Sequence, residues 1–338
     1  MSENLRVAVI GAGRMGTDHV QRLHHRIRGA EVAAVVDVDA ARAQAAVEGI
    51  DGAVALTEAD TAFDRADVNA VLVATPGFLH EDILHKALRR NLPVLCEKPL
   101  TQDAASSWNI VQAEAELGRQ LIQVGFMRRY DQGYSQLREI IQSGELGDLL
   151  MLHCAHRNPY VPDNFTEGNV ITEAAVHEFD IIRFLTGEEI TGVQVRRGRT
   201  TRHPGLGLSD PQQVLIETAG GTLADVEVFV NAQFGYQVAT EAVFERGIVN
   251  IGGDSGPYIR SAGRWGGSIA AGFEDRFSAA YDREFQVWAD STREGRVDGP
   301  TAWDGYAAAA CCEAGLEAQR TGNPIKVSLN QKPALYGE

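Results

Sequence analysis

Apolar and amphipathic segments alternate along the first 125 residues. Short apolar runs typical of buried strands are each followed by a stretch with helical periodicity, and the run at 70–75 is continuous, as expected for a strand covered on both faces. Repeated strand–helix units predict an α/β fold with a doubly wound parallel sheet of the Rossmann type. The expected strands are 5–10, 31–37, 70–75, one ending at Lys98, and 120–124; the expected helices are 15–27, 40–47, 81–90 and one that Thr101 caps and that runs towards Gly118.

The pattern changes after Gly125. Alternating or β-branched segments separated by turn residues now dominate, which is typical of an antiparallel sheet. The expected strands are 149–156, 191–197, 213–218, 222–230, 238–245 and 248–251, and the expected helices are 130–143, 172–185, 273–294 and 302–320. We therefore predict an N-terminal domain at 1–125 and a C-terminal α+β domain at 126–338 with a large, mostly antiparallel sheet.

Composition narrows the class of protein. Of the 338 residues, 44% are apolar and 23% are charged, as in globular proteins of about two domains. No apolar run approaches the ~20 residues of a membrane span, and the N-terminus lacks the apolar region of a secretory signal. Four cysteines without Cys-x-x-Cys spacing are typical of reduced thiols, and the net charge of −15 opposes nucleic-acid binding. We expect a cytoplasmic protein with a small-molecule ligand or a protein partner, and neither a membrane nor a nucleic acid as partner.

A glycine motif directly follows the first predicted strand and opens the first predicted helix. Gly11, Gly13 and Gly16 match G-x-G-x-x-G, which permits a tight turn, close approach of the backbone to a pyrophosphate, and close helix–strand packing. The helix N-terminus adds amide donors and a partial positive charge. Asp37 ends the second predicted strand, where a carboxylate accepts hydrogen bonds from the adenosine ribose and repels a 2′-phosphate. The motif predicts dinucleotide binding with NAD preferred over NADP; the alternative is a glycine turn without a ligand.

Lys98 follows a short apolar strand that is bounded by prolines. Ligands of open α/β sheets collect at the carboxyl ends of strands, so Glu97 and Lys98 lie where a bound molecule is expected. A lysine held there can stabilise a hydroxyl as it loses its proton. The alternative is an ordinary Lys–Glu pair on the surface.

A polar stripe marks the segment 171–187, which is predicted to be a helix ending at Gly187. Glu173, His177 and Asp180 are spaced i, i+4 and i+7, so they are expected to share one helix face. A carboxylate one turn from an imidazole raises its basicity, and such a histidine can take a proton from an alcohol. The alternative is a solvated face with a surface salt bridge.

A metal site is not expected. The nearest candidates are His153 and His156, which fall in a predicted strand. Residues three apart in a strand point to opposite faces, so these two imidazoles are not expected to share one ion.

Several motifs spread over nearly the whole chain resemble those of the Gfo/Idh/MocA oxidoreductase family, and within it those of the bacterial inositol dehydrogenases. The motifs are Gly11-x-Gly13-x-x-Gly16, Thr75-Pro76 followed by His80, Glu97-Lys98-Pro99, Gly125-Phe126-Met127-Arg128-Arg129-Tyr130-Asp131, His156-Arg157-Asn158-Pro159 and His177-Glu178-Phe179-Asp180. Together they are specific to the family, and the later ones point to its inositol branch. The glycine motif alone is not specific.

The resemblance implies an NAD-dependent dehydrogenase that oxidises a secondary hydroxyl of a cyclic polyol, most simply myo-inositol to 2-keto-myo-inositol. By resemblance, Lys98 and His177 match the family's catalytic lysine and histidine, with Glu173 beside them. The residues expected to contact the substrate or support its site are Arg128, His156, Asn158, Asp180 and Tyr236. The residues expected to bind NAD are Gly11, Gly13, Arg14, Met15, Gly16, Asp37, Thr75, Pro76, His80, Glu97 and Lys98.

Glu173 departs from the inositol branch, which typically has aspartate four residues before the histidine. The charge is kept, but the carboxylate lies one methylene further out, so a dehydrogenase for scyllo-inositol or a pyranose sugar is an alternative. An NAD-dependent glycosidase, as found among relatives, is another. A third is a dinucleotide-binding regulatory protein without turnover, although such relatives tend to lose the catalytic residues, whereas Lys98 and His177 are both present.

One face of the predicted C-terminal sheet is expected to need cover. Its predicted helices are too few to cover both faces, so one face needs another surface. The resemblance implies a homotetramer packed through these sheets.

Overall fold

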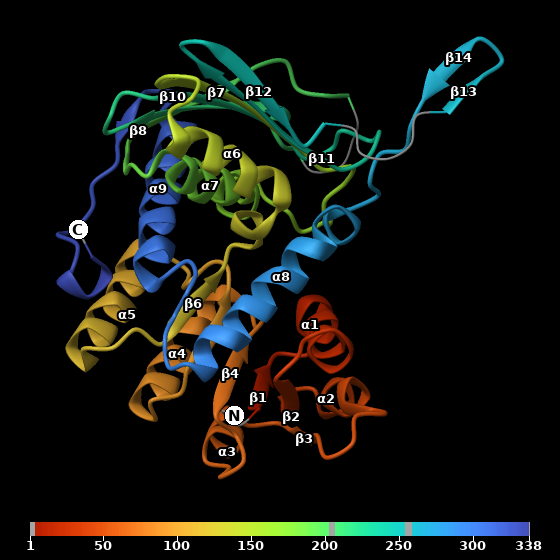
Figure 1. Ribbon diagram of the computed structural model, residues 1–338, viewed down its shortest axis with the longest axis vertical. Coiled ribbons are helices and arrows are strands. Elements are labelled where there is room, and N and C mark those ends of the chain that lie inside the picture. The colour runs from red at the N-terminus through yellow and green to blue at the C-terminus, as the bar shows by residue number, and fades with distance from the viewer. Residues whose placement is uncertain (1–3, 203–206, 254–258, 338) are drawn as a thin grey trace. The chain divides into compact units, whose positions relative to one another are not determined.

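The computed structural model describes residues 4–202, 207–253 and 259–337. Contacts group the chain into two compact units, each with a β-sheet packed against helices (Figure 1). The first unit is formed by Met1–Phe126, Tyr281–Ala309 and Leu329–Glu338, and the second by Met127–Ala280 and Ala310–Ser328. No helix within the described residues is long and apolar enough to cross a membrane.

The first unit contains a six-stranded parallel sheet with the order β3-β2-β1-β4-β5-β6. The strands are β1 (Leu5–Ile10), β2 (Ala30–Val36), β3 (Val54–Leu56), β4 (Ala70–Val73), β5 (Val94–Glu97) and β6 (Ile122–Gly125). The central strands β1 and β4 are almost completely buried, which explains their continuous apolar runs. This order confirms the predicted Rossmann fold, in which ligands bind at the strand ends where the order reverses.

Helices connect these strands. They are α1 (Arg14–His25), α2 (Ala40–Val47), α3 (Ala59–Phe63), α4 (His80–Arg89) and α5 (Ala104–Leu117), with the 3₁₀ turn η1 (Gly77–Leu79) before α4. Two later helices, α8 (Phe273–Arg293) and α9 (Ala302–Thr321), contribute residues 281–293 and 302–309. Phe285 and Trp288 of α8 are buried in one hydrophobic cluster with Val7, Val9 and Val32 of β1 and β2.

Two details of this unit differ from the predictions. Strand β3 and helix α3 were not predicted, because segments of three and five residues are too short to show a period. Thr101 does not cap α5. Asp103 is the cap, and its carboxylate accepts a hydrogen bond from Ser106 N at 2.7 Å, while the Thr101 hydroxyl donates to the Asp103 carbonyl at 3.2 Å.

The second unit contains a seven-stranded sheet with the order β12-β11-β7-β10-β9-β8-β15. Its strands are β7 (Leu149–Arg157), β8 (Ile190–Arg197), β9 (Gln212–Thr218), β10 (Leu223–Phe229), β11 (Gln237–Phe244), β12 (Gly247–Ile251) and β15 (Ile325–Lys326). Only β7 and β10 pair in parallel, so the mostly antiparallel sheet is confirmed. Two further strands, β13 (Ile259–Ser261) and β14 (Arg264–Gly266), form a separate hairpin.

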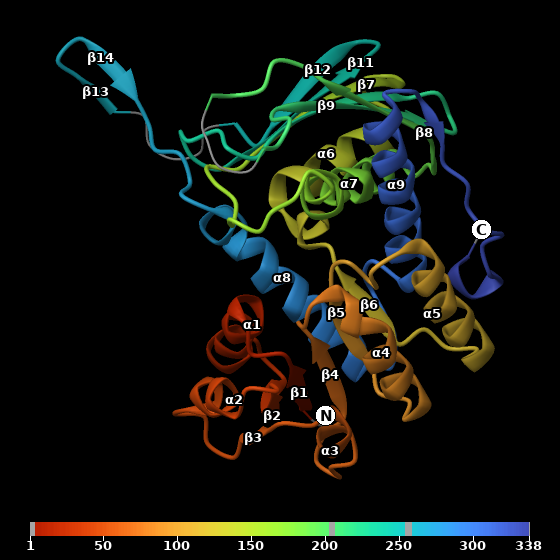
Figure 2. The ribbon, with the colours of Figure 1, turned by 180° about the vertical axis from the view of Figure 1, so that it is seen from behind.

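One face of the large sheet packs against helices, as Figure 2 shows. The helical elements of this unit are η2 (Met127–Tyr130), α6 (Gln132–Ser143), η3 (Val170–Ala175) and α7 (Val176–Thr186), with 273–280 of α8 and 310–321 of α9. The predicted helix over 171–187 thus begins with the π-helical segment η3 and continues as α7. It ends at Gly187, which has a φ of +71°.

The C-terminal residues return to the first unit. In the 3₁₀ turn η4 (Ala334–Tyr336), the Tyr336 hydroxyl donates to Glu114 Oε2 at 2.6 Å. The Glu114 side chain is fully buried and also accepts the backbone N–H groups of Leu121 and Ile122, at 2.5 and 2.7 Å. Burial raises the pKa of Glu114, and these donors oppose that effect.

We expect Tyr336→Phe to lower the free energy of unfolding by about 1–3 kcal/mol, because a buried carboxylate loses one of its donors. Urea denaturation measures the change. Tyr160→Phe is the matched control, since the Tyr160 side chain is 71% exposed, and it should leave stability unchanged. Equal stability of Tyr336→Phe and the parent protein would contradict the expected contribution.

Candidate functional site

The glycine loop between β1 and α1 is closed on one side and open on the other. A Cβ at Gly11, where φ is +102°, would lie 2.7 Å from the Ala74 carbonyl oxygen, and one at Gly16 would lie 1.9 Å from the Gly11 carbonyl oxygen. Around Gly13, in contrast, no heavy atom lies within 4 Å of an added Cβ. The backbone at Gly13 can therefore approach a phosphate at the N-terminus of α1.

Asp37 lies directly after β2, and its carboxylate orders two backbone segments. Oδ2 accepts a hydrogen bond from Ala12 N at 2.8 Å, and Oδ1 accepts one from Asp39 N at 2.9 Å. The Asp37 side chain is only 8% exposed. It thus braces the glycine loop, and each carboxylate oxygen keeps a lone pair for a further donor. At the start of α1, Arg14 is exposed and Met15 is half-buried.

Thr75, Pro76 and His80 lie after β4. His80 is fully buried, with Nε2 2.7 Å from the Thr75 carbonyl oxygen and Nδ1 2.8 Å from the Pro99 carbonyl oxygen. Its ring therefore links the loop after β4 to the segment that follows Lys98. Pro76 is exposed, and the buried Thr75 hydroxyl has no hydrogen-bond partner among the described residues.

Glu97 fixes the backbone of Lys98 at the end of β5. Its Oε2 accepts a hydrogen bond from Lys98 N at 3.1 Å, and its Oε1 lies 2.7 Å from Nε2 of His19. His19 is fully buried in α1 and packs against Phe285, with 4.6 Å between the ring centroids. The half-buried Lys98 is therefore positioned through a buried imidazole–carboxylate contact.

The second unit holds a buried ion pair between Arg128 and Glu178. Both side chains are 1% exposed, and the guanidinium donates to Glu178. Arg128 Nη2 lies 3.1 Å from His156 Nδ1, and this nitrogen lies 3.3 Å from Glu178 Oε1. Burial alone would raise the pKa of Glu178, but Arg128 and His156 hold it below its ordinary value. Burial and the charge of Arg128 lower the pKa of His156, so this imidazole is neutral near pH 7.

Three further predicted residues lie close to His156. The His156 ring centroid is 6.3 Å from that of His177 and 6.2 Å from that of Tyr236. Burial raises the pKa of Tyr236, so its phenol stays protonated. His177 is half-buried, as is Asn158, whose backbone N–H donates to the Phe229 carbonyl at 2.9 Å. The structure thus groups Arg128, His156, His177 and Tyr236.

Glu173, His177 and Asp180, which are predicted to share one helix face, differ in exposure. Glu173 is exposed in η3, whereas the Asp180 side chain is 1% exposed. Asp180 is held by Arg129, whose Nε lies 3.1 and 3.0 Å from its two oxygens. The π-helical turn changes the angular spacing between residue 173 and the α-helix that follows.

His153 and His156 point to opposite faces of the sheet, as expected from their spacing. The His153 side chain is 42% exposed and contacts Asp225, whereas that of His156 is 4% exposed. Over residues 4–202, 207–253 and 259–337, no group of three or more His, Cys, Asp or Glu side chains is placed to hold a metal ion.

Arg129 and Glu178 belong to the family motifs but have no predicted role in the site, and His19 is not among the predicted site residues. A signal existed for Glu178, because Ile181 and Ile182 lie three and four residues further on and place its charge in the apolar stripe of α7. A charge in such a stripe needs a buried partner. The contacts of His19 and Arg129 depend on tertiary packing and have no local signal.

Comparison with known proteins gives the family. The oxidoreductase family with an NAD-binding Rossmann fold matches residues 5–126, and the GFO/IDH/MocA C-terminal domain matches residues 134–250. An inositol 2-dehydrogenase of Arthrobacter sp. (strain FB24) is 66% identical over 336 residues, which cover 99% of this chain and 100% of that relative. The chain belongs to the GFO/IDH/MocA oxidoreductase family. An inositol 2-dehydrogenase of Streptomyces avermitilis is 52% identical, over 100% of this chain and 98% of the relative.

Solved structures similar to this GFO/IDH/MocA protein have the same fold. The myo-inositol dehydrogenase of Lactobacillus casei, solved with NAD(H) and myo-inositol, has a TM-score of 0.95 at 34% identity, covering 98% of this chain and 99% of that chain. The scyllo-inositol dehydrogenase of the same species, with NAD(H) and scyllo-inositol, has a TM-score of 0.90 and covers 96% and 99%. Its 24% identity supports the fold alone.

The residues of this family member fit NAD. The space at Gly13 accommodates a pyrophosphate, and Asp37 stands at the strand end where the adenosine ribose is held. The Thr75 hydroxyl is buried without a hydrogen-bond partner among the described residues, and a hydroxyl can both donate and accept a hydrogen bond. These observations agree with the NAD-binding Rossmann fold matched at residues 5–126.

Two alanine substitutions in the glycine loop should have different effects. Gly16→Ala forces its Cβ against the Gly11 carbonyl, so we expect about 1–3 kcal/mol lower stability. Gly13→Ala meets no protein atom, so it should largely keep its stability yet bind NADH more weakly, because the methyl group intrudes where the pyrophosphate lies. Urea denaturation and NADH fluorescence titration separate the two effects. Unchanged NADH affinity in Gly13→Ala would contradict the assigned position of the pyrophosphate.

Glu178→Gln should lower the free energy of unfolding by about 3–5 kcal/mol, because it leaves the Arg128 charge buried without its counter-charge. Since the folded-state pKa of Glu178 is lowered, its contribution is present above the ordinary value of 4.5 and is lost as the pH falls through the lowered pKa. The glutamine variant should lack this loss. Urea denaturation at a series of pH values measures both effects.

The double variant Arg128→Met/Glu178→Leu is the matched control for that prediction. It replaces both charges by apolar groups, so it should regain most of the stability that Glu178→Gln loses. A Glu178→Gln variant as stable as the parent protein would show that the buried pair contributes nothing.

Proposed function

We propose that this protein is an NAD-dependent inositol 2-dehydrogenase that oxidises myo-inositol to 2-keto-myo-inositol. The observation that carries the proposal is the 66% identity, over 99% of the chain, to an inositol 2-dehydrogenase. The myo-inositol dehydrogenase solved with NAD(H) and myo-inositol adds support, with the same fold at 34% identity. Lys98 and His177 supply the acid–base groups that such a reaction needs.

We assign the two parts of the reaction to the two predicted domains. Residues 1–125 bind NAD, and residues 126–338 bind the polyol and associate with other copies. The glycine loop, Asp37 and Thr75 support the first assignment. The buried group around Arg128 and His156 supports the second.

His177 and Lys98 carry the proton chemistry. The His177 imidazole accepts the proton of the secondary hydroxyl, and the Lys98 ammonium stabilises the alkoxide as negative charge develops on oxygen. The C–H bond breaks as the C=O bond forms. NAD, held by the glycine loop and Asp37, would supply the acceptor for the hydride.

The remaining residues orient these groups. His19 and Glu97 hold the Lys98 backbone, and His80 holds the segment that follows it. Arg128 and Glu178 fix the ring of His156, so that its neutral imidazole keeps one orientation towards the polyol. Asn158 and Tyr236 add polar contacts to the ring hydroxyls, and Asp180 acts through Arg129.

Glu173 favours a second candidate, oxidation of scyllo-inositol or a pyranose sugar. It stands where the inositol branch typically has aspartate, and its side chain is exposed in the π-helical segment before His177. A longer carboxylate there changes which hydroxyl is accepted.

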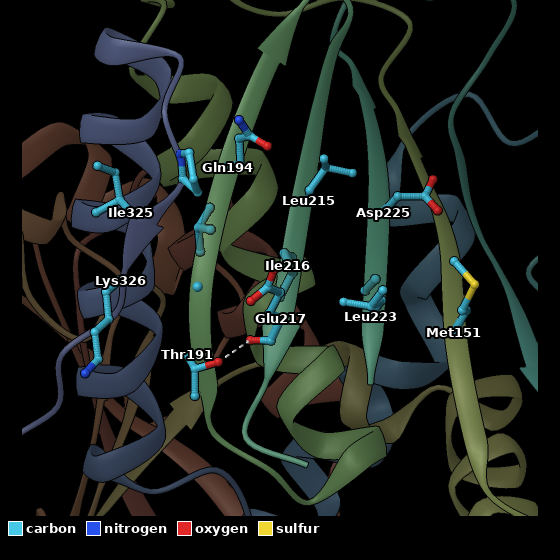
Figure 3. A pocket seen from close by; sticks show the side chains of 14 residues that line it. Met151, Thr191, Gln194, Leu215, Ile216, Glu217, Leu223, Asp225, Ile325 and Lys326 are labelled. Atoms are coloured by element: carbon cyan, nitrogen blue, oxygen red, sulfur yellow. Dashed lines mark hydrogen bonds between the residues drawn. The ribbon is translucent and has the colours of Figure 1, made fainter. Parts of the chain in front are cut away.

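We also propose that the protein forms a homotetramer through its large sheets. On the face of the sheet opposite to α6 and α7, a hollow of about 530 Å³ is lined by Met151, Leu215, Leu223 and Ile325 (Figure 3). Leu215 and Leu223 are 38% and 46% exposed. Apolar groups on an open sheet face are stabilised by burial against another surface, and the same face of a second copy is the proposed partner.

The cytoplasm is the proposed location. All four cysteines are free and buried. Such thiols persist in a reducing compartment, whereas secreted proteins usually pair them.

A substrate screen tests the proposed reaction directly. With NAD and each of myo-inositol, scyllo-inositol and glucose, we expect the largest kcat/KM for myo-inositol, measured as NADH absorbance. Preference for scyllo-inositol or glucose would support the candidate that Glu173 favours. If no NADH forms with any of the free polyols, the proposed dehydrogenase activity is wrong.

Two substitutions test the assigned roles. Lys98→Met should lower kcat by about 10²–10³-fold, because the developing alkoxide loses its positive charge, with little change in NADH affinity. His177→Ala should lower kcat by about 10²–10⁴-fold and remove the acidic limb of the pH–rate profile, since that limb reports the base. Lys332→Met and His25→Ala, at residues that have no assigned role in the site, are the matched controls. Near-normal turnover of Lys98→Met would show that the role is wrong.

A further inference from the structure

The hairpin of β13 and β14 is a defined element separate from the large sheet of its unit. The two strands pair in the register Ile259↔Gly266, Arg260↔Trp265 and Ser261↔Arg264. Among the described residues, neither strand pairs with the seven-stranded sheet. The two residues of the turn, Ala262 and Gly263, have φ of +51° and +73°, the left-handed pair that a tight type I′ hairpin turn requires.

The hairpin presents apolar side chains to solvent. Ile259 is 67% exposed and Trp265 is 73% exposed, and every residue from 259 to 269 is exposed. In both Figure 1 and Figure 2 the hairpin projects from the end of a long connection, away from the large sheet of the same unit. An isolated two-stranded hairpin is marginally stable in water. This hairpin is therefore stabilised when its apolar side chains pack against another surface.

The hairpin is basic, whereas the chain is acidic. Arg260 and Arg264 are the only charged residues between 259 and 266, while the whole chain has 46 acidic and 31 basic residues. Two copies with a net charge of −15 repel one another, and a local pair of arginines offsets that repulsion where they meet carboxylates. Tryptophan and arginine are also the residue types that dominate binding energy at interfaces.

We propose that this hairpin is an arm that packs on an acidic surface of a second copy of the chain. Trp265 and Ile259 become buried there, and Arg260 and Arg264 pair with carboxylates of that copy. In a two-fold assembly the exchange is reciprocal, so each subunit gives one arm and receives one. The arm rests on the association of copies proposed above, and it adds a contact that is separate from the packing of the sheets.

The test follows Trp265 in the full-length protein from nanomolar to micromolar concentration. Acrylamide quenching of the parent protein, compared with Trp265→Phe, isolates the signal of this residue, and sedimentation velocity gives the oligomeric state of the same samples. We expect the quenching of Trp265 to fall severalfold as the protein associates. In Arg260→Glu/Arg264→Glu it should stay high, and the dissociation constant should rise at least about tenfold, the effect of losing 1.4 kcal/mol.

Two further variants control for charge and folding. Arg89→Glu/Arg119→Glu makes the same change in net charge on exposed arginines of the first unit, and it should associate like the parent protein. Trp265→Ser removes the indole without changing charge, and it should also weaken association. Circular dichroism confirms that each variant is folded.

Three outcomes would overturn the arm. An oligomer in which Trp265 is still fully quenched would contradict the arm contact but agree with packing through the sheets. A protein that stays monomeric at every concentration would contradict both proposed contacts. Protection of Trp265 only on vesicles of anionic phospholipid identifies a membrane surface as the occupant instead. None of these outcomes depends on NADH production, so the proposed reaction is tested independently.

Discussion

The close approach of Gly16 to Gly11 is the constraint on which the first unit depends. Because Gly16 has no side chain, its backbone can lie against the Gly11 carbonyl, so α1 begins shortly after β1 ends and runs back along the sheet. That course brings His19 to Glu97, and Glu97 holds the backbone of Lys98. The close packing of Gly16 on Gly11 thus helps to position both the N-terminus of α1 and, through His19 and Glu97, the backbone of Lys98.

Buried charges of the second unit are arranged in fixed pairs. Arg128 is paired with Glu178, and Asp180 is paired with Arg129. Removing an ion from water costs several kcal/mol, so each buried charge is tolerated only with a well-placed partner. The partners also restrict rotation, which leaves His156 with one ring orientation before any ligand arrives. The partners that make the buried charges tolerable therefore also hold the polar groups of this unit in a preorganised arrangement.

Periodicity in the sequence predicts most of the fold, because buried strands and amphipathic helices leave repeating apolar patterns. It does not reveal the π-helical turn before His177, since a single i→i+5 turn has no repeat of its own. The candidate site likewise has one part that local sequence predicts and another part that it does not. The glycine loop, Asp37 and Lys98 follow from local motifs, whereas the pairing of Arg128 with Glu178 joins residues 50 apart and depends on tertiary packing. Short local motifs therefore indicate the candidate residues of the site, whereas the contacts that hold these residues in place are known only from the folded structure.

Helix α8 completes the hydrophobic core of the first unit, although it is synthesised late. Phe285, Trp288 and Ala289 fill the core beside β1 and β2, yet the ribosome adds them long after the parallel sheet has emerged. Part of the apolar surface of the amino-terminal sheet therefore stays exposed to solvent while most of the second unit is synthesised. Nascent chains that stop near residue 280 lack this cover, so premature termination late in the gene damages the half of the protein that was translated first.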